Sequence, residues 1–400
     1  MPDAKVFSRD VLLISFSAFF ADLGYQGVTA LFPLYLVLAR HAPVYAYGLI
    51  TAASFGVGSL FAWLGGHAGD RWDRKRTAIA GNLFIPLMSL SGLFVNAWAA
   101  GAFFILGWWA RYFRTPSRRA LLVDVSPPEA RAKVFGFLHA LDIGGGMFSV
   151  LFALFFVLVM KLPIGRIIFL SILPLLVSTA LLLLVRRERQ YPPAPPAPPA
   201  SSSEQERERS RKKTLYLALL AAATCYGFSF YNAGYPVLTA AMHQHSGYAL
   251  GLLAYFIYLG VSALSGYALG ARRPRALRAL WRLGYLPSAI ASLLIAASLY
   301  FHLPALAFYL FVAGLGLSMG AVETFEPTAA SQLVESPALA RGMGWLSVAR
   351  SLGQFVSNLI MGLLFSFSQA LAYGYAFAAS LAATAILAAA DLAHPPGGRR

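Results

Sequence analysis

Six ionisable residues interrupt the long apolar stretches of this 400-residue sequence. They are Asp22, Arg111, His139, Asp142, Glu323 and Arg350. An ionisable group inside a membrane helix costs on the order of 3 kcal/mol or more, so it is retained for a reason. A carboxyl group held in low dielectric can bind and release a proton near neutral pH, and an arginine can pair with it or bind an anion. These residue types therefore indicate proton binding and ion pairing within a membrane protein.

Asp22 is the strongest candidate for a proton-binding residue, because it lies midway along the first apolar run and Gln26 follows one turn later. A structural role, as the ion-pair partner of Arg111, is the alternative. Arg111 either binds an anionic substrate or neutralises an acid such as Asp22 or Glu323. Glu323 is a second proton-site candidate, or it binds a cationic substrate.

His139 and Asp142 are three residues apart, so they share one face of a helix. They form either a proton relay or a static pair that stabilises helix packing. Arg350 is a candidate for pairing with Asp142 or with another acid of its own half. The sequence alone does not say which acids pair with Arg111 and Arg350.

Aromatic and amide side chains gather in the first and seventh apolar runs, where they are candidates for lining a substrate cavity. With Arg111, this set consists of Tyr25, Gln26, Tyr226, Phe230, Tyr231 and Asn232. Packing, or a position in the aromatic belt at the membrane surface, is the alternative for each aromatic residue.

The composition is that of a polytopic membrane protein, with 58% hydrophobic and 12% charged residues, whereas soluble domains carry about 25% charged residues. The net charge is +16, but the bases are concentrated in loops. The expected partner is therefore the anionic inner leaflet of the bilayer. We expect no nucleic acid as a partner, because no basic tract is interleaved with aromatic residues.

Twelve apolar runs are long enough to cross a bilayer. They are Val11–Leu38, Tyr45–Leu64, Thr77–Val95, Trp98–Phe113, Phe135–Val159, Ile167–Val185, Leu215–Thr239, Tyr248–Leu269, Leu283–Tyr300, Ala305–Phe325, Met343–Phe365 and Ala370–Ala390. With both termini in the cytoplasm, most of the 32 Lys and Arg residues fall in inside loops, as the positive-inside rule requires. This assignment puts Arg114 and Arg118 in the loop after the fourth run. The absence of an Asn-x-Ser/Thr sequon favours a prokaryotic cytoplasmic membrane.

The loop between the second and third runs reads Gly-His-Ala-Gly-Asp-Arg-Trp-Asp-Arg-Lys-Arg from Gly66 to Arg76. It resembles the signature loop of the major facilitator superfamily, except that Asp73 replaces the usual Gly. The resemblance implies an all-α fold of two six-helix bundles related by pseudo-two-fold symmetry. It also implies that the Gly lets two helices approach closely and that the loop forms a cytoplasmic gate. The implied gate residues are Gly66, Asp70, Arg71, Arg74, Lys75, Arg76 and their acidic partner Asp124.

The two halves of the chain look like repeats. We expect one bundle in residues 1–190, a cytoplasmic Pro-rich and charged linker in residues 191–213, and a second bundle in residues 214–400. Gly266 to Arg273 repeats the signature loop without its Asp, and the segment from Glu326-Pro327 repeats the one from Arg114-Thr115-Pro116. The latter segment resembles a subgroup of prokaryotic permeases of unassigned substrate.

The predicted function is that of a secondary transporter that moves a small molecule by alternating access and is coupled to protons. Export is slightly favoured, although the fifth run lacks the Gly-Pro motif that proton antiporters of the family often carry. The alternatives are an uptake symporter or uniporter and, remotely, a membrane enzyme acting on a lipid-linked substrate. We expect no catalytic residues, metal or cofactor. An ATP-driven pump is disfavoured, because no Gly-x-x-x-x-Gly-Lys phosphate-binding motif occurs. By analogy with the family, we expect a monomer.

Overall fold

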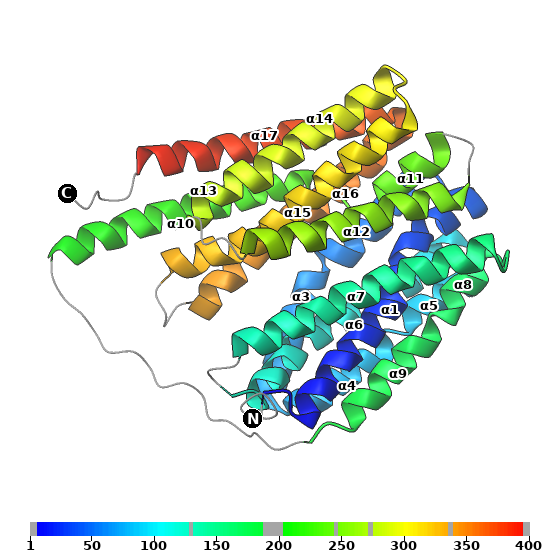
Figure 1. The fold of residues 1–400 in the computed structure, drawn as a ribbon, viewed down its shortest axis with the longest axis horizontal. Coiled ribbons are helices and arrows are strands. Elements are labelled where there is room, and N and C mark those ends of the chain that lie inside the picture. The colour runs from blue at the N-terminus through cyan, green and yellow to red at the C-terminus, as the bar shows by residue number, and fades with distance from the viewer. Residues whose placement is uncertain are drawn as a thin grey trace. The chain divides into compact units, whose positions relative to one another are not determined.

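The computed structural model describes residues 6–127, 131–186, 203–243, 247–270, 275–334 and 339–394, and within these ranges the regular structure is helical (Figure 1). The α-helices are α1 (Arg9–Pro33), α2 (Val44–Thr51), α3 (Gly58–Arg71), α4 (Arg74–Phe84), α5 (Leu87–Leu90), α6 (Ala97–Asp124), α7 (Arg131–Leu158), α8 (Ile164–Leu170), α9 (Ile172–Leu183), α10 (Ser203–Ser229), α11 (Gly234–His243), α12 (Tyr248–Gly270), α13 (Ala276–Ala279), α14 (Leu286–Tyr300), α15 (Ala305–Leu333), α16 (Leu339–Phe367) and α17 (Gln369–Ala393). Short π-helical or 3-10 turns at Leu34–Ala39, Ala52–Gly56, Ser91–Leu93 and Leu280–Tyr285 adjoin these helices.

Within the described ranges, 10 helical segments are long and apolar enough to cross a membrane. The two remaining predicted runs are also helical. One is the α4–α5 pair, which is interrupted at Pro86, and the other is α6, which carries four arginines. A proline interrupts a helix because it has no N–H group to donate.

The predicted seventh run, Leu215–Thr239, is not one continuous helix. It divides into α10 and α11, with non-helical backbone between Ser229 and Gly234. Glycine is a weak helix former and Pro236 fits only the first turn of a helix, so the sequence favours this break. At its other end, α10 begins at Ser203 and takes in the last part of the predicted linker, whereas residues 191–202 lie outside the described ranges.

The described residues form two compact units, each with its own internal contacts. Unit 1 takes in the described parts of Met1–Ala194 and Ala233–Leu259, and unit 2 takes in those of Pro195–Asn232 and Gly260–Arg400. The domain boundaries predicted from the sequence stay a prediction.

In unit 1, α1 packs along α7 and α9, and α6 packs against α3 and α4 (Figure 1). Helix α11 packs on α1, and the rings of Tyr47 and Tyr235 meet edge to face with their centroids 5.4 Å apart. The Tyr255 hydroxyl donates a hydrogen bond of 2.7 Å to Gln26 Oε1 on α1. These contacts attach α11 and the first half of α12 to the helices of the N-terminal half.

In unit 2, α10 packs against both α16 and α17, and α14 packs against α15 and α17 (Figure 1). Its apolar core includes Leu219, Tyr226, Leu280, Tyr285 and Phe325, all buried. Unit 2 therefore holds α10, α14, α15, α16 and α17 against one another.

Local sequence signals set the helix starts that position the charged residues. The side chain of Asn96 accepts hydrogen bonds from the backbone N–H groups of Trp98 and Ala99, which makes it the N-cap of α6. Asp73 caps α4 in the same way, with its Oδ1 accepting from Arg76 N at 2.6 Å. Helix α6 then runs for 28 residues, so its arginines lie on the helix and not in a loop.

Candidate functional site

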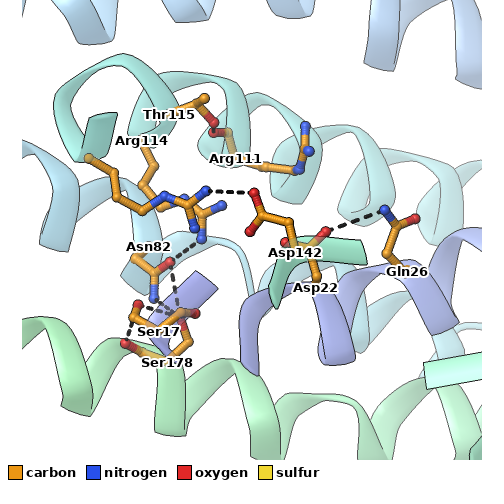
Figure 2. A network of polar contacts seen from close by, with 10 residues as sticks. Ser17, Asp22, Gln26, Asn82, Arg111, Arg114, Thr115, Asp142 and Ser178 are labelled. Carbon is orange, nitrogen blue, oxygen red and sulfur yellow. Dashed lines mark hydrogen bonds and ion pairs between the residues drawn. The ribbon is translucent and has the colours of Figure 1, made fainter. Parts of the chain in front are cut away.

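Asp22 is a buried acid in the middle of α1, only 3% exposed. Gln26 Nε2, one turn further on, donates a hydrogen bond of 3.4 Å to Asp22 Oδ1 (Figure 2). The other carboxylate oxygen, Oδ2, is buried and has no hydrogen-bond partner among the described residues. Arg111 of α6 and Asp142 of α7 are the charged groups that lie near Asp22 in Figure 2. The site therefore contains a buried carboxyl group that faces both an acid and a base and keeps one oxygen unpartnered.

Three arginines lie on one face of α6, because Arg111, Arg114 and Arg118 follow at intervals of three and four residues. Arg114 is 0% exposed and Arg118 3%. The guanidinium carbon of Arg111 lies 4.6 Å from the ring centroid of Tyr25 and 4.8 Å from that of Trp108. The Nε atoms of all three arginines, and Nη1 of Arg118, are buried without a hydrogen-bond partner in the described part of the chain.

A chain of uncharged polar groups holds Arg114 in place (Figure 2). Arg114 Nη1 donates to Asn82 Oδ1 on α4 at 2.6 Å. Asn82 Nδ2 in turn donates to Thr179 Oγ1 at 2.8 Å and to Ser178 Oγ at 3.1 Å, both on α9. The hydroxyl oxygens of Ser178 and Ser17 are 3.0 Å apart, which extends the network to α1. The network thus ties α6 to three other helices of unit 1.

Asp142 on α7 pairs with Arg118 on α6, with 3.6 Å between Asp142 Oδ2 and Arg118 Nη2. The Asp142 side chain is 25% exposed, and its Oδ1 is buried without a hydrogen-bond partner in the described ranges. His139 is exposed on the same helix. Among the described residues, no hydrogen bond or ion pair joins His139 to Asp142, so the observed partner of this acid is Arg118.

The sequence-based placement of Arg114 and Arg118 in a cytoplasmic loop is wrong, because both lie within α6 and are buried. The charges and Pro116 in this segment suggested a helix end, but α6 continues through Pro116 to Asp124. Neighbouring helices allow such a proline by satisfying the backbone groups that it frees. The spacing of the three arginines, at intervals of three and four residues, is the sequence signal that could have placed them on one helix. Asn82 gave no signal, since it is uncharged.

Unit 2 contains an ion-pair cluster centred on Arg350 of α16, in which one partner, Glu326, is buried. Arg350 Nη1 lies 2.9 Å from Glu326 Oε2 and its Nη2 lies 2.5 Å from Glu323 Oε1, both on α15. The Tyr285 hydroxyl donates to Glu326 Oε1 at 2.9 Å, and the guanidinium carbon of Arg350 lies 4.5 Å from the Phe230 ring centroid. Of the two expected partners of Arg350, an acid of its own half is the observed one: Arg350 binds two acids of unit 2, one of which is the proton-site candidate Glu323. Asp142, the other expected partner, pairs with Arg118 instead.

The two ion pairs join corresponding helices of the two halves at the same sequence spacing, with their charges inverted. In each unit the partners are 24 residues apart, on α6 and α7 in unit 1 and on α15 and α16 in unit 2. Glu326 follows Arg118 by 208 residues and Arg350 follows Asp142 by the same number. The pair in unit 1 is long and leaves buried atoms unpartnered, whereas the pair in unit 2 is short and supported by Glu323 and Tyr285.

The candidates for lining a substrate cavity are divided between the units. Tyr25, Gln26 and Arg111 belong to unit 1, and Tyr226, Phe230, Tyr231 and Asn232 belong to unit 2. The ring of Tyr226 stacks on Tyr285 with centroids 4.4 Å apart, and the backbone N–H of Asn232 donates to Asn358 Oδ1 at 3.2 Å. Phe230, Tyr231 and Asn232 lie in the break between α10 and α11. Their part in substrate binding stays a prediction.

Arg74 is the centre of the charged loop between α3 and α4. It pairs with Asp70 at 3.1 Å and with Asp124, at the end of α6, at 2.8 Å. Partial burial opposes the charged form of Arg74, but the hydrogen bonds to Asp124 and Asp70 outweigh this and raise its pKa above the usual value.

Lys75 Nζ donates to the backbone oxygens of Leu183 and Val185 at the end of α9, at 2.9 and 2.5 Å. A lysine in this position stabilises the C-terminus of a helix. Arg71, at the end of α3, and Arg76, in the first turn of α4, are exposed.

The close helix approach occurs at Gly65, next to the predicted Gly66. A Cβ atom on Gly65 would collide with the backbone oxygen of Phe113 on α6, whereas one on Gly66 would meet Pro116 Cβ at an ordinary 3.6 Å. We therefore expect Gly65→Ala to lower the free energy of unfolding by about 1–3 kcal/mol, because the helix backbones must move apart. Gly66→Ala is the matched control, with an expected change below about 0.5 kcal/mol. Equal thermal stability of the two purified variants would contradict this packing.

Asp70→Asn tests the proposed gate. The Asp70 side chain is 71% exposed in its pair with Arg74, so we expect its loss to change the free energy of unfolding by less than about 1 kcal/mol. If the loop controls which side of the protein is open, the same change will alter cysteine labelling of residues near the site while leaving substrate binding intact. A labelling pattern identical to that of the unmutated protein would contradict a role of Asp70 in the gate.

The comparisons with known proteins agree with this architecture. The family model of the Major Facilitator Superfamily matches residues 14–358. No curated protein matches the chain. Similar solved structures include a POT family transporter in complex with a thioalcohol-conjugated peptide, at 12% identity and a TM-score of 0.76 over 97% of both chains. A D-xylose–proton symporter matches at 12% identity and a TM-score of 0.73, over 94% of this chain and 97% of its own. A bacterial homologue of the human lysosomal transporter Spinster matches at 15% identity and a TM-score of 0.67, over 96% and 95%.

At these identities the structural likeness concerns the fold, and it confirms the all-α membrane architecture predicted from the sequence. The family match extends over most of the chain. The protein therefore belongs to the major facilitator superfamily and is an integral membrane protein that acts as a secondary transporter, not an enzyme.

Proposed function

We propose that this transporter couples the movement of a small molecule to protons and that Asp22 is the proton-binding group. The observation that carries the proposal is the buried Asp22 carboxyl group with its unpartnered Oδ2. A proton on that oxygen removes the cost of a buried charge, and loss of the proton restores the attraction to Arg111. The two protonation states are thus each stabilised by a different feature of the site.

The groups that face Asp22 come from several elements of unit 1. Asp142 of α7 disfavours its charged form, whereas Arg111 and Arg118 of α6 favour it. Tyr25 lies on α1 itself, and Tyr255 of α12 reaches the site through its hydrogen bond to Gln26. Opposing influences of this kind are typical of groups that change protonation during function.

A purely structural role for Asp22 is the competing explanation. Buried structural acids have their oxygens hydrogen-bonded in most proteins. Glu326 of unit 2 fits that description, since its two oxygens bind Tyr285 and Arg350 at 2.9 Å each. Asp22 differs in its unpartnered oxygen, which supports a functional role. Asp142, whose Oδ1 is also unpartnered, is the second candidate for carrying a proton.

Proton flux into liposomes tests the proposal. The purified protein is reconstituted with a pH-sensitive dye inside, and candidate anions, cations and neutral metabolites are added in turn. A substrate-dependent pH change supports coupling, and its sign separates symport from the antiport that export would use. Substrate entry without any pH change would refute the coupling and leave facilitated transport.

A further inference from the structure

We propose that the arginine row of α6, formed by Arg111, Arg114 and Arg118, binds an oxyanion group of the transported molecule. The group is a carboxylate or a phosphate, since both present the paired oxygens that guanidinium groups recognise. This inference names the substrate class for the transport function proposed above and rests on that function.

The first argument is the charge of the site. The row brings three guanidinium groups together with the carboxyl groups of Asp22 and Asp142. Three positive and two negative charges leave one positive charge in excess, in a buried part of unit 1. An uncompensated buried charge is costly, so the site gains free energy when an anion supplies the missing negative charge.

The second argument is the number of hydrogen-bond donors. Arg114 and Arg118 are more than nine-tenths buried, and each keeps an Nε–H group without a partner in the described ranges. Arg118 Nη1 and Arg111 Nε are buried and unpartnered as well. Buried donors are nearly always satisfied in folded proteins, so four unpartnered nitrogens around one row of arginines indicate a ligand that accepts hydrogen bonds.

The third argument comes from the inverted pair in unit 2. There a single guanidinium group, that of Arg350, lies between Glu323 and Glu326. No buried nitrogen or oxygen of Arg350 or Glu326 lacks a partner in the described part of the chain. Both halves therefore carry an ion pair at this spacing, and among the described residues the pair in unit 1 is the one accompanied by unpartnered donors and excess positive charge. This contrast assigns the anion to unit 1.

Asp22 competes with the anion, because it provides a negative charge close to Arg111. Asp22→Asn removes this negative charge and should therefore strengthen anion binding. Arg111→Gln removes a positive charge and should weaken anion binding. Opposite effects at two neighbouring positions distinguish an anion site from a general loss of packing, which would weaken binding in both variants.

The test is equilibrium binding to the full-length protein in lipid nanodiscs, with no proton gradient. The probes are benzoate, inorganic phosphate and the neutral benzamide, each followed by isothermal titration calorimetry. We expect saturable binding of benzoate or phosphate and none of benzamide. If benzoate binds more tightly than phosphate, the recognised oxyanion is a carboxylate. If phosphate binds more tightly, it is a phosphate group.

Arg111→Gln is expected to weaken binding about tenfold or more, because a charge-assisted hydrogen bond is lost. Asp22→Asn is expected to strengthen it severalfold. Arg119→Gln is the matched control, because it removes the same charge from an exposed position on the same helix, and its affinity should equal that of the unmutated protein. Arg111→Lys keeps the positive charge, so this variant should bind the oxyanion with intermediate affinity. It keeps the test decisive if Arg111→Gln fails to fold.

Equal binding of benzamide and benzoate, binding of neither oxyanion, or equal weakening by Arg119→Gln and Arg111→Gln would overturn the anion site. These outcomes are independent of proton coupling. If benzoate binds as expected but its transport moves no protons, the proposed coupling fails and the anion site remains.

Discussion

Asp22→Asn is expected to abolish transport driven by a proton gradient, down to the level of liposomes without protein. The asparagine keeps the size of the side chain and its hydrogen bond with Gln26, but it cannot take up or release a proton. Exchange of substrate across the membrane without a gradient should persist, since it needs only the substrate site. The measurement is accumulation and exchange of labelled substrate in the same liposomes.

Asp391→Asn is the matched control for this variant. Asp391 is also buried, at 6% exposure, but it belongs to unit 2, where it lies on α17 and binds Arg278 at 2.9 Å. Its replacement should leave proton-driven accumulation in place. Full accumulation by the Asp22→Asn protein would return Asp22 to a structural role.

Arg350→Met is expected to lower the free energy of unfolding by about 3–5 kcal/mol, because Glu326 is left buried and unpaired. Glu326 is only 2% exposed, so water cannot replace the lost partner. The equivalent change in unit 1, Arg118→Met, should cost less, about 1–2 kcal/mol, because its partner Asp142 is 25% exposed and the pair is long at 3.6 Å. Denaturation in mixed detergent micelles measures both.

A double variant separates pairing from packing. Glu326→Gln combined with Arg350→Met removes both charges, and such a change is often close to neutral when the volume is kept. It should therefore be more stable than Arg350→Met alone. A double variant as unstable as the single one would mean that the packing of Arg350 on Phe230, and not its charge, stabilises unit 2.

The fold could be predicted from the sequence because its signals are repeated along the chain. Apolar runs, the segregation of bases into loops and the Gly66–Arg76 motif all indicate the same architecture. The break between α10 and α11 was missed because Gly234 and Pro236 are common within membrane helices, and only their combination with the preceding residues ends α10.

The acids of the candidate site were predictable, but the arginines were not all placed correctly. Asp22 and Asp142 lie inside apolar runs, where any charge is conspicuous. Arg114 and Arg118 lie beyond the apolar part of α6, where the positive-inside rule assigns bases to loops. Their burial depends on helices α4, α7 and α9 folding around them, which no local pattern contains. The charge inversion between the halves became visible only when the structure paired Arg118 with Asp142 and Arg350 with Glu326.

The most direct test of the central claim is an infrared difference spectrum of the protein titrated with acid. A protonated carboxylic acid has a carbonyl stretch that a carboxylate lacks, so a buried acid that takes up a proton adds a band. We predict that the unmutated protein and Asp391→Asn share one titrating carbonyl band that Asp22→Asn lacks, while the bands of the other carboxyl groups remain in all three spectra. A titrating band that survives unchanged in Asp22→Asn would contradict the assignment of the proton to Asp22.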